Sequence, residues 1–381
     1  MSNKKENASC PLKKTSIGGQ ALLEGIMMRG PKKSAMAVRR PDGEMVVEVS
    51  DLKSADRKGF LKWPVVRGVV GFVDSMTVGY QAMMRSAELS GLDEAIEEEE
   101  REKAAKKAAK EQAKKAKKLG ITVEELAAQE AAEKETEAET SAEAPTEESA
   151  PEVKEEKKDT SGMMTGIMVV ALILGLGLAM LLFKVLPESI YELLTWAIPS
   201  LEGEGYWFNL IRAAITGVVK IAIMVAYMAA VALMKDIKRT FMYHGAEHKT
   251  IFCYEQGLEL TVENVRRQSR FHPRCGTSFL ILMLLVSIVI NMFIPATLVD
   301  HKILNIIART GIGLLTLPFI MGIGYELIRF AGRHDNLFTR IISAPGVWLQ
   351  HITTKEPDDS MIECAIAAVK EVIPEDGSDN W

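Results

Sequence analysis

Four long apolar runs stand out in the second half of the chain. They cover residues 163–183, 210–234, 278–299 and 311–330, and the first and third contain no charged residue. At 1.5 Å per residue, a helix of about 20 residues crosses the ~30 Å hydrocarbon core of a bilayer. The pattern therefore predicts a mainly α fold: a polytopic helical membrane protein with about four transmembrane helices. Buried helices of a soluble protein are the alternative, which runs of this length disfavour.

Basic residues are distributed unevenly between these runs. Segment 235–277 holds eight Lys and Arg residues, whereas segment 184–209 holds one. Because basic loops favour the cytoplasmic side, we expect segment 235–277 to face the cytoplasm. An even number of spans then places both termini on that side of the plasma membrane. No apolar stretch follows the first residues, so no signal peptide is expected.

Residues 17–92 are predicted to form a small mixed α/β cytoplasmic part. Segments 34–40 and 44–49 flank a Pro-Asp-Gly sequence at 41–43. That sequence is typical of a β-hairpin turn, because Pro presets φ and Gly accepts positive φ. Residues 60–89 mix apolar and charged positions, which predicts an amphipathic helix on the membrane surface or against the bundle.

The remaining segments are polar. We expect a flexible N-terminus at 1–16, a charged linker at 93–160 that is first helical and then disordered, and a cytoplasmic C-terminal part at 331–381. Residues 91–160 contain 22 acidic and 13 basic residues, and the whole chain has a net charge of −5. A nucleic-acid partner is therefore not expected. The four cysteines show no paired spacing, which argues against a disulfide scaffold.

Segment 235–277 carries the candidate chemistry. His244, Glu247 and His248 form an H-x-x-E-H sequence. On a helix, residues four apart share a face, so both imidazoles can reach one metal ion, zinc or another divalent cation. Glu247 is the candidate catalytic residue, as a general base for an attacking water.

Further ligands must come from elsewhere in the chain. His272 and Cys275 have ligand-like spacing just before the third apolar run, and Cys253 and Glu255 are additional options. Four protein ligands would make a structural site, whereas three would leave a position open for catalysis. The sequence leaves this choice open, and polar interactions without any metal remain a third interpretation.

Other roles are open for some of these residues. Cys275 lies just before a predicted helix and directly after Arg274. The helix dipole and this arginine favour a thiolate, and hence a nucleophilic or redox role. The same helix start, with Arg274, could bind a lipid phosphate. Glu326, near the end of the fourth run, could pair with Arg329 or complete the metal site.

Four motifs in chain order carry a family resemblance. They run from Gly18 to Pro31, His244 to Lys249, His272 to Thr277 and Thr353 to Asp359. Together they resemble the YqhQ-like family of bacterial inner-membrane proteins, which are built on a domain of unknown function and described as predicted metal-dependent enzymes. The resemblance covers residues 15–92 and 160–373.

The resemblance adds three candidate site residues. It implies that Gln20, Glu24 and Arg29 face the His/Cys segment. The alternative is a turn packed under the bundle, for which the glycines of the first motif would provide close approaches.

The leading hypothesis is a zinc-dependent hydrolase at the cytoplasmic membrane face. Its substrate would be a lipid, a peptide or another molecule close to the membrane. The rival is a non-enzymatic assembly or scaffolding factor with a structural metal site or none. The lipid bilayer is the expected partner, with a further protein or lipid partner possible on the cytoplasmic face. A transporter is disfavoured, because few charges lie within the runs. The oligomeric state stays open.

Overall fold

The computed structural model describes most of the chain outside its N-terminus and the charged linker. The described residues are 13–52, 59–91, 101, 110, 160–203, 205–295, 297–334 and 336–380. They belong to two compact units, one formed by Met1–Ser90 with Leu176–Trp381 and the other by Gly91–Gly175. The flexible start and the linker predicted at 93–160 lie almost wholly outside the described residues.

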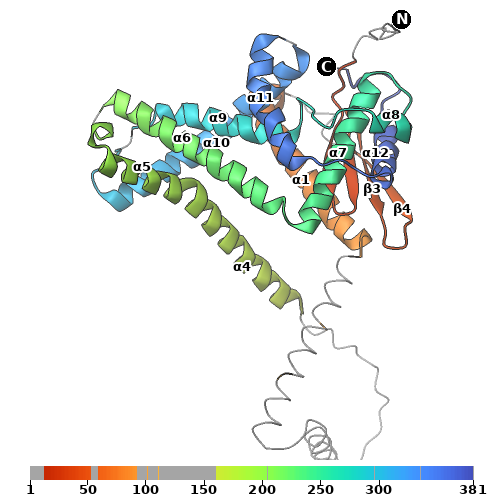
Figure 1. Cartoon of the computed structure of the whole chain (residues 1–381), viewed down its shortest axis with the longest axis horizontal. Helices are drawn as coiled ribbons and strands as arrows, with labels where there is room; N and C mark the ends of the chain where they lie inside the picture. Colours follow the sequence, from red (N-terminus) through yellow and green to blue (C-terminus); the bar gives the residue numbers. More distant parts are fainter. Residues whose placement is uncertain are drawn as a thin grey trace, which may run out of the picture. The chain divides into compact units, whose positions relative to one another are not determined.

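The N-terminal part forms a four-stranded antiparallel sheet in the order β1-β2-β3-β4. Strands β3 and β4 of this sheet are labelled in Figure 1. The strands are β1 (Gly18–Leu22), β2 (Gly25–Arg29), β3 (Lys33–Arg39) and β4 (Met45–Asp51). The hairpin predicted around the Pro-Asp-Gly turn is confirmed as β3–β4. Strands β1 and β2 were not predicted, because they are rich in Gly and Met and contain a single residue of the β-branched type that is typical of strands, Ile26.

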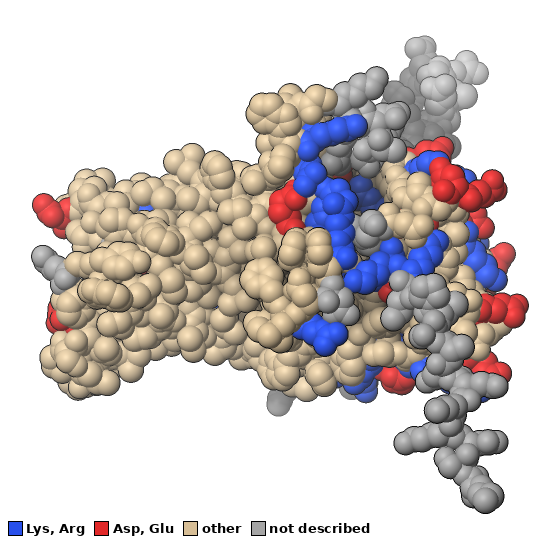
Figure 2. All heavy atoms as spheres, turned by 90° about the horizontal axis from the view of Figure 1, so that it is seen from above, with Lys and Arg blue, Asp and Glu red and all other residues tan. Residues whose placement is uncertain are grey.

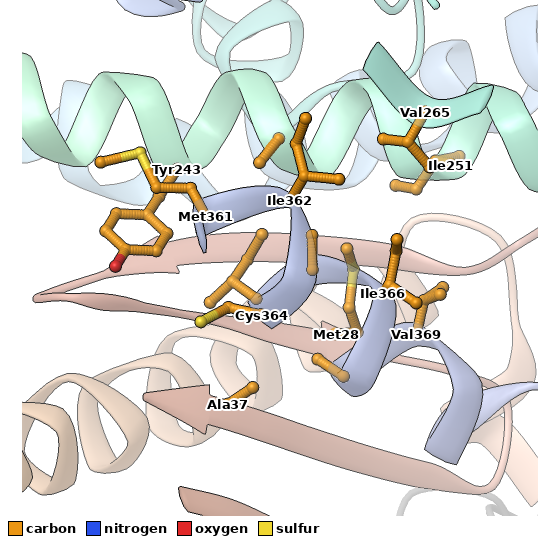
Figure 3. Packing of buried hydrophobic residues seen from close by; sticks show 14 of the residues in the cluster. Met28, Ala37, Tyr243, Ile251, Val265, Met361, Ile362, Cys364, Ile366 and Val369 are labelled. Atoms are coloured by element: carbon orange, nitrogen blue, oxygen red, sulfur yellow. The ribbon is translucent and has the colours of Figure 1, made fainter. Parts of the chain in front are cut away.

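The central strands send alternate side chains into two different hydrophobic clusters. Ile26 and Met28 of β2 pack against α7 (Lys235–Glu255) and α12 (Asp359–Val372). Met27, between them, packs against α1 (Val66–Leu89) on the opposite face. This period of two makes the sheet a middle layer, with α7 and α12 on one face and α1 on the other. Figure 3 shows the α7–α12 side of this core.

The rest of the described chain is mainly helical, as predicted. The further elements are η2 (Gly59–Lys62), α4 (Thr160–Met180), the π-helical turn η3 (Leu181–Val185), α5 (Leu186–Ala197), η4 (Pro199–Leu201), α6 (Tyr206–Val231), α8 (Val262–Arg266), α9 (Gly276–Met292), α10 (Lys302–Arg333) and α11 (Leu337–Thr353). Helix α9 packs against α6, α10 and α11.

Three helices are long and apolar enough to cross a membrane, which suggests a membrane protein. Among the described residues they are Val170–Ala197, Tyr206–Val231 and Ile303–Arg333. Three of the four predicted spans are therefore found among the described helices, each with shifted bounds. The run at 278–299 gives the 17-residue helix α9, which ends at Met292. Its length is about 25 Å, short of the ~30 Å hydrocarbon core.

The early end of α9 has a local cause. Pro295 lacks a backbone N–H and disfavours helical geometry at the residue before it, so the helix stops although the apolar run continues.

Two segments expected as loops are largely helical. After the run at 163–183, the chain continues through the π-helical turn into α5, where Glu188 pairs with Arg212 of α6 at 2.6 Å. This pairing lets charged residues remain within packed helices. Segment 235–277 begins with the 21 residues of α7, and the run at 311–330 lies inside the longer α10.

The two ends of the described chain meet beside α7. Thr15 and Tyr254 donate hydrogen bonds to the same carboxylate oxygen of Asp379, at 2.7 and 2.9 Å. Lys13 pairs with this carboxylate at 3.2 Å, and the Asp379 side chain is completely buried. These contacts tie the segments before β1 and after α12 to the end of α7.

Asp379 should make stability depend on pH. Burial raises its pKa, but the hydrogen bonds from Thr15 and Tyr254 and the charge of Lys13 outweigh burial and lower it. A carboxyl with a lowered pKa stabilises the fold above its unfolded pKa of about 4, and this stabilisation is lost as the pH falls towards the folded pKa. We expect Asp379→Asn to lower the thermal unfolding temperature at neutral pH. It should also weaken the further decrease between about pH 5 and 3. An unchanged pH profile in circular-dichroism melts would contradict this.

The core between the sheet and α12 should tolerate truncation poorly. Val369 of α12 is fully buried, whereas Val49 of β4 is 44% exposed. Val369→Ala removes two buried methyl equivalents and leaves a cavity, so it should lower the free energy of unfolding by about 2 kcal/mol or more. The matched change Val49→Ala should cost much less. Equal shifts of the two variants in thermal melts would show that α12 does not form the core.

Candidate metal centre

Helices α7 and α9 bring three of the predicted ligands together. His244 and His248 lie one turn apart on the same face of α7, and Cys275 is the N-cap residue of α9. Their nearest ligand atoms all lie within 4.8 Å of one another. These three side chains could hold one metal ion, because two imidazoles and one thiolate are suitable ligands for a transition metal.

The backbone fixes the orientation of both imidazole rings. His244 Nδ1 lies 2.8 Å from the carbonyl oxygen of Thr353, and His248 Nδ1 lies 2.6 Å from that of Arg270. A carbonyl only accepts hydrogen bonds, so each Nδ1 carries a proton and each Nε2 is directed to the cluster. Metal-ligating histidines are commonly held in this way.

The sulfur of Cys275 lies where a thiolate is stabilised. It accepts hydrogen bonds from the backbone N–H and the hydroxyl of Thr277, at 3.4 and 3.3 Å, and lies 3.0 Å from His244 Nε2. Burial raises the pKa of the thiol, but the neighbouring His244 and His248 outweigh burial and hold that pKa well below its usual range. The thiolate is the form of cysteine that binds metals.

The pKa of His244 shifts in the opposite direction. Burial lowers it, but the Cys275 sulfur and the Glu247 carboxylate outweigh burial and raise this pKa to about 10. Both shifts favour the thiolate of Cys275 beside the imidazolium of His244 when no ion is bound. An ion bound by the same atoms would replace the proton on Nε2.

Two buried polar atoms beside this pair have no hydrogen-bond partner among the described residues. They are Glu247 Oε2 and His248 Nε2. The other Glu247 oxygen accepts a hydrogen bond from the backbone N–H of Gly19 at 2.9 Å. An unpaired buried polar atom costs about 1–3 kcal/mol, so two of them on neighbouring residues indicate that a ligand belongs at this end of the two side chains. The donor set therefore fits a metal ion.

The fourth predicted ligand, His272, lies next to the cluster rather than in it. Its ring centroid is 5.6 Å from that of His248, and its Nε2 faces Glu255 at 3.5 Å. Burial lowers the pKa of His272 to about 4, so the ring is neutral at pH 7. Arg274 pairs with Glu255 as well. The buried thiol of Cys253 is directed away from the cluster, towards the carbonyl of Glu259.

The residues added by the family resemblance are not grouped around the cluster. Glu24 lies in the turn between β1 and β2 and pairs with Arg239 of α7. Arg29 donates a hydrogen bond to Ser75 of α1 at 2.9 Å. Gln20 also faces α1, since a Cβ added to Gly79 would clash with the side-chain oxygen of Gln20. This motif contacts the site through the backbone N–H of Gly19, which donates a hydrogen bond to Glu247. This contact was not predicted from the sequence, because the prediction considered side chains.

Glu326 has a different partner from the one predicted. It lies on α10 and forms a bidentate ion pair with Arg67 of α1, with a shortest N···O distance of 2.5 Å. Close packing of α1 on α10 makes this pair possible: a Cβ added to Gly68 would lie 2.8 Å from Tyr325 Cβ. Among the described residues, Glu326 is not part of the group that could hold a metal ion.

Comparison with known proteins agrees with the motifs. Residues 63–375 match the family described as "Protein of unknown function (DUF1385)". The chain is 28% identical to the "Uncharacterized protein YqhQ" of Bacillus subtilis (strain 168) over 364 residues, which cover 94% of this chain and 92% of that protein. No solved structure matches the chain. The family match spans most of the chain and confirms the resemblance seen in the sequence, so this protein belongs to the DUF1385, YqhQ-like family.

Proposed function

We propose that this protein is a metal-dependent hydrolase that acts at the cytoplasmic face of the plasma membrane. The observation that carries the proposal is the convergence of His244, His248 and Cys275, with Nε2 of His248 and the neighbouring Oε2 of Glu247 both buried without a hydrogen-bond partner among the described residues. A set of two nitrogens and one sulfur favours zinc. Three protein ligands leave one coordination position open, which is characteristic of catalytic sites.

The bound ion would supply Lewis-acid polarisation of a carbonyl or phosphoryl oxygen. The chain's own residues would orient the reactants and move protons. Thr353 and Arg270 hold the two imidazoles through their carbonyl oxygens, so the ligands need little reorganisation.

Glu247 is suited to accept a proton. Its Oε1 is anchored by Gly19, while its Oε2 has no hydrogen-bond partner among the described residues. Burial raises the pKa of Glu247, although both histidines oppose this shift. A carboxylate with a raised pKa is a stronger base at neutral pH.

The rival function is a non-enzymatic scaffold in which the metal ion has a purely structural role. A structural zinc site is normally closed by four protein ligands. Among the described residues the group contains three, and His272 is engaged with Glu255. The incomplete ligand set and the unpaired Glu247 oxygen therefore favour a catalytic metal site over a structural one.

The metal site can be tested directly by elemental mass spectrometry. Protein purified in detergent without a chelator should contain about one divalent ion per chain. The double variant His244→Ala/His248→Ala should lose that ion, since it removes two of three ligands. His301→Ala, at the start of α10, is the matched control and should keep it. Absence of metal from the unaltered protein, or its retention in the double variant, would contradict the site.

The role of Glu247 can be tested separately from metal binding. Glu247→Gln preserves size and should leave metal content and thermal unfolding largely unchanged. It should reduce turnover of any ester, phosphoester or peptide substrate found by screening by about 100-fold or more. Glu371→Gln, at an exposed position of α12, is the control. Full activity in Glu247→Gln would rule out this residue as the base.

A further inference from the structure

A second site of different chemistry lies between the sheet, α1 and the end of α10. It is a pocket of about 740 Å³, a size typical of small-molecule sites. Its lining includes five basic residues and, among the described residues, no Asp or Glu. The basic residues are Arg29, Lys62, Arg67, Arg329 and Arg333.

The pocket is bounded by three parts of the structure, and each contributes basic side chains to the lining. On α10, Arg329 and Arg333 are four residues apart and therefore share a face with each other. On α1, Arg67 is followed at the same spacing by Gly71 and Ser75. These two residues are small and leave space for a ligand on this face of the helix. The third wall is the β1–β2 pair, where Gly18 is in register with Arg29.

The positive charge of this pocket is only partly neutralised within the protein. Arg67 is paired with Glu326, and Arg29 contacts Ser75. Within the described part of the chain, Lys62, Arg329 and Arg333 form no ion pair with a carboxylate. Like charges around one space repel each other, so an anion that enters the pocket is favoured electrostatically.

The kinds of donor indicate which anion fits. Arginine presents a planar fork of N–H donors that matches the oxygens of a phosphate group. The space next to Gly18 in β1 is open, because a Cβ added to Gly18 would meet nothing within 4 Å. A ligand can therefore come close to the backbone of β1. A phosphate group could therefore reach the arginines from this side without a steric barrier.

The position of the pocket indicates how such a ligand arrives. Arg329 and Arg333 lie in the last two turns of Ile303–Arg333, one of the helices long and apolar enough to cross a membrane. Close to Lys62 in the sequence, Phe60 and Trp63 are 63% and 66% exposed. Basic and aromatic residues at the end of an apolar helix are typical of the headgroup level of a bilayer. Figure 2 shows a band of Lys and Arg on one face, next to a part nearly free of charge.

We propose that this pocket binds the phosphate group of an anionic ligand at the membrane boundary. The membrane supplies such a group in the headgroup of an anionic phospholipid, and the cytoplasm supplies it as free phosphate. The site does not depend on the metal centre, because none of the three metal-ligand candidates lines it.

The test is equilibrium binding to the full chain in nonionic detergent, with a chelator present so that a metal ion cannot contribute. The probes are dihexanoyl phosphatidic acid, dihexanoyl phosphatidylcholine and inorganic phosphate, measured by isothermal titration calorimetry. Arg329→Gln/Arg333→Gln should weaken binding of phosphatidic acid at least about tenfold, since two charge-assisted contacts are lost. The matched control Lys235→Gln/Lys238→Gln removes the same charge from exposed positions of α7 outside the pocket and should leave binding unchanged.

The outcomes separate the sources of the ligand. Phosphatidic acid that binds more tightly than both other probes supports the site and identifies a lipid headgroup. Inorganic phosphate that binds as tightly as phosphatidic acid, with the same loss in the arginine variant, supports the site with free phosphate as its ligand. No measurable binding of either anion, or equal effects of the two double variants, would overturn the proposal.

Discussion

The fold depends on the burial of polar side chains along α7. Glu247, His248, Lys249, Thr250 and Glu255 are all buried, although each has a group that water would solvate well. Removing such groups from water is unfavourable unless hydrogen bonds or ion pairs replace the lost solvation. The segments packed against α7 must therefore supply partners at defined positions.

Most of these partners come from distant parts of the sequence. Lys249 contacts Glu356 and donates a hydrogen bond to the carbonyl of Arg266. Glu255 accepts a hydrogen bond from the backbone of Thr15 and pairs with Arg274. Each contact fixes one segment against α7, so the polar face of this helix determines how the surrounding chain is arranged. The two unpaired atoms at Glu247 and His248 are exceptions in an otherwise satisfied face, which is why they indicate a ligand.

The sequence predicted those features that a short local pattern determines. The hairpin at 41–43 follows from turn chemistry, and the shared face of His244 and His248 follows from helical periodicity. The sequence also predicted that the apolar runs are helical, but it did not predict where the helices end. Helix α9 ends before Pro295, although the apolar run continues. At the end of the first run, the helix continues through a π-helical turn.

The rest of the site depends on contacts that leave little trace in the sequence. The carbonyl oxygens of Thr353 and Arg270 orient the imidazoles, and any residue type provides a carbonyl. Likewise, the N–H of Gly19 anchors Glu247 from a strand that no β-branched pattern identified. Position 19 must also lack a side chain, because a Cβ there would lie 2.9 Å from the Glu247 carboxyl carbon.

Strand β1 connects the two sites. Gly19 lines the basic pocket and also donates its N–H to Glu247, so a single peptide unit separates the pocket from the candidate base. Met27 O and Met28 Sδ of β2 lie as close to the missing Cβ as Glu247 does, so any side chain at position 19 would clash with both β2 and α7. An anion held by the arginines would thus lie against the strand that also positions Glu247. The basic pocket and the candidate base thus lie on either side of this one strand, and the close packing there requires a glycine at position 19.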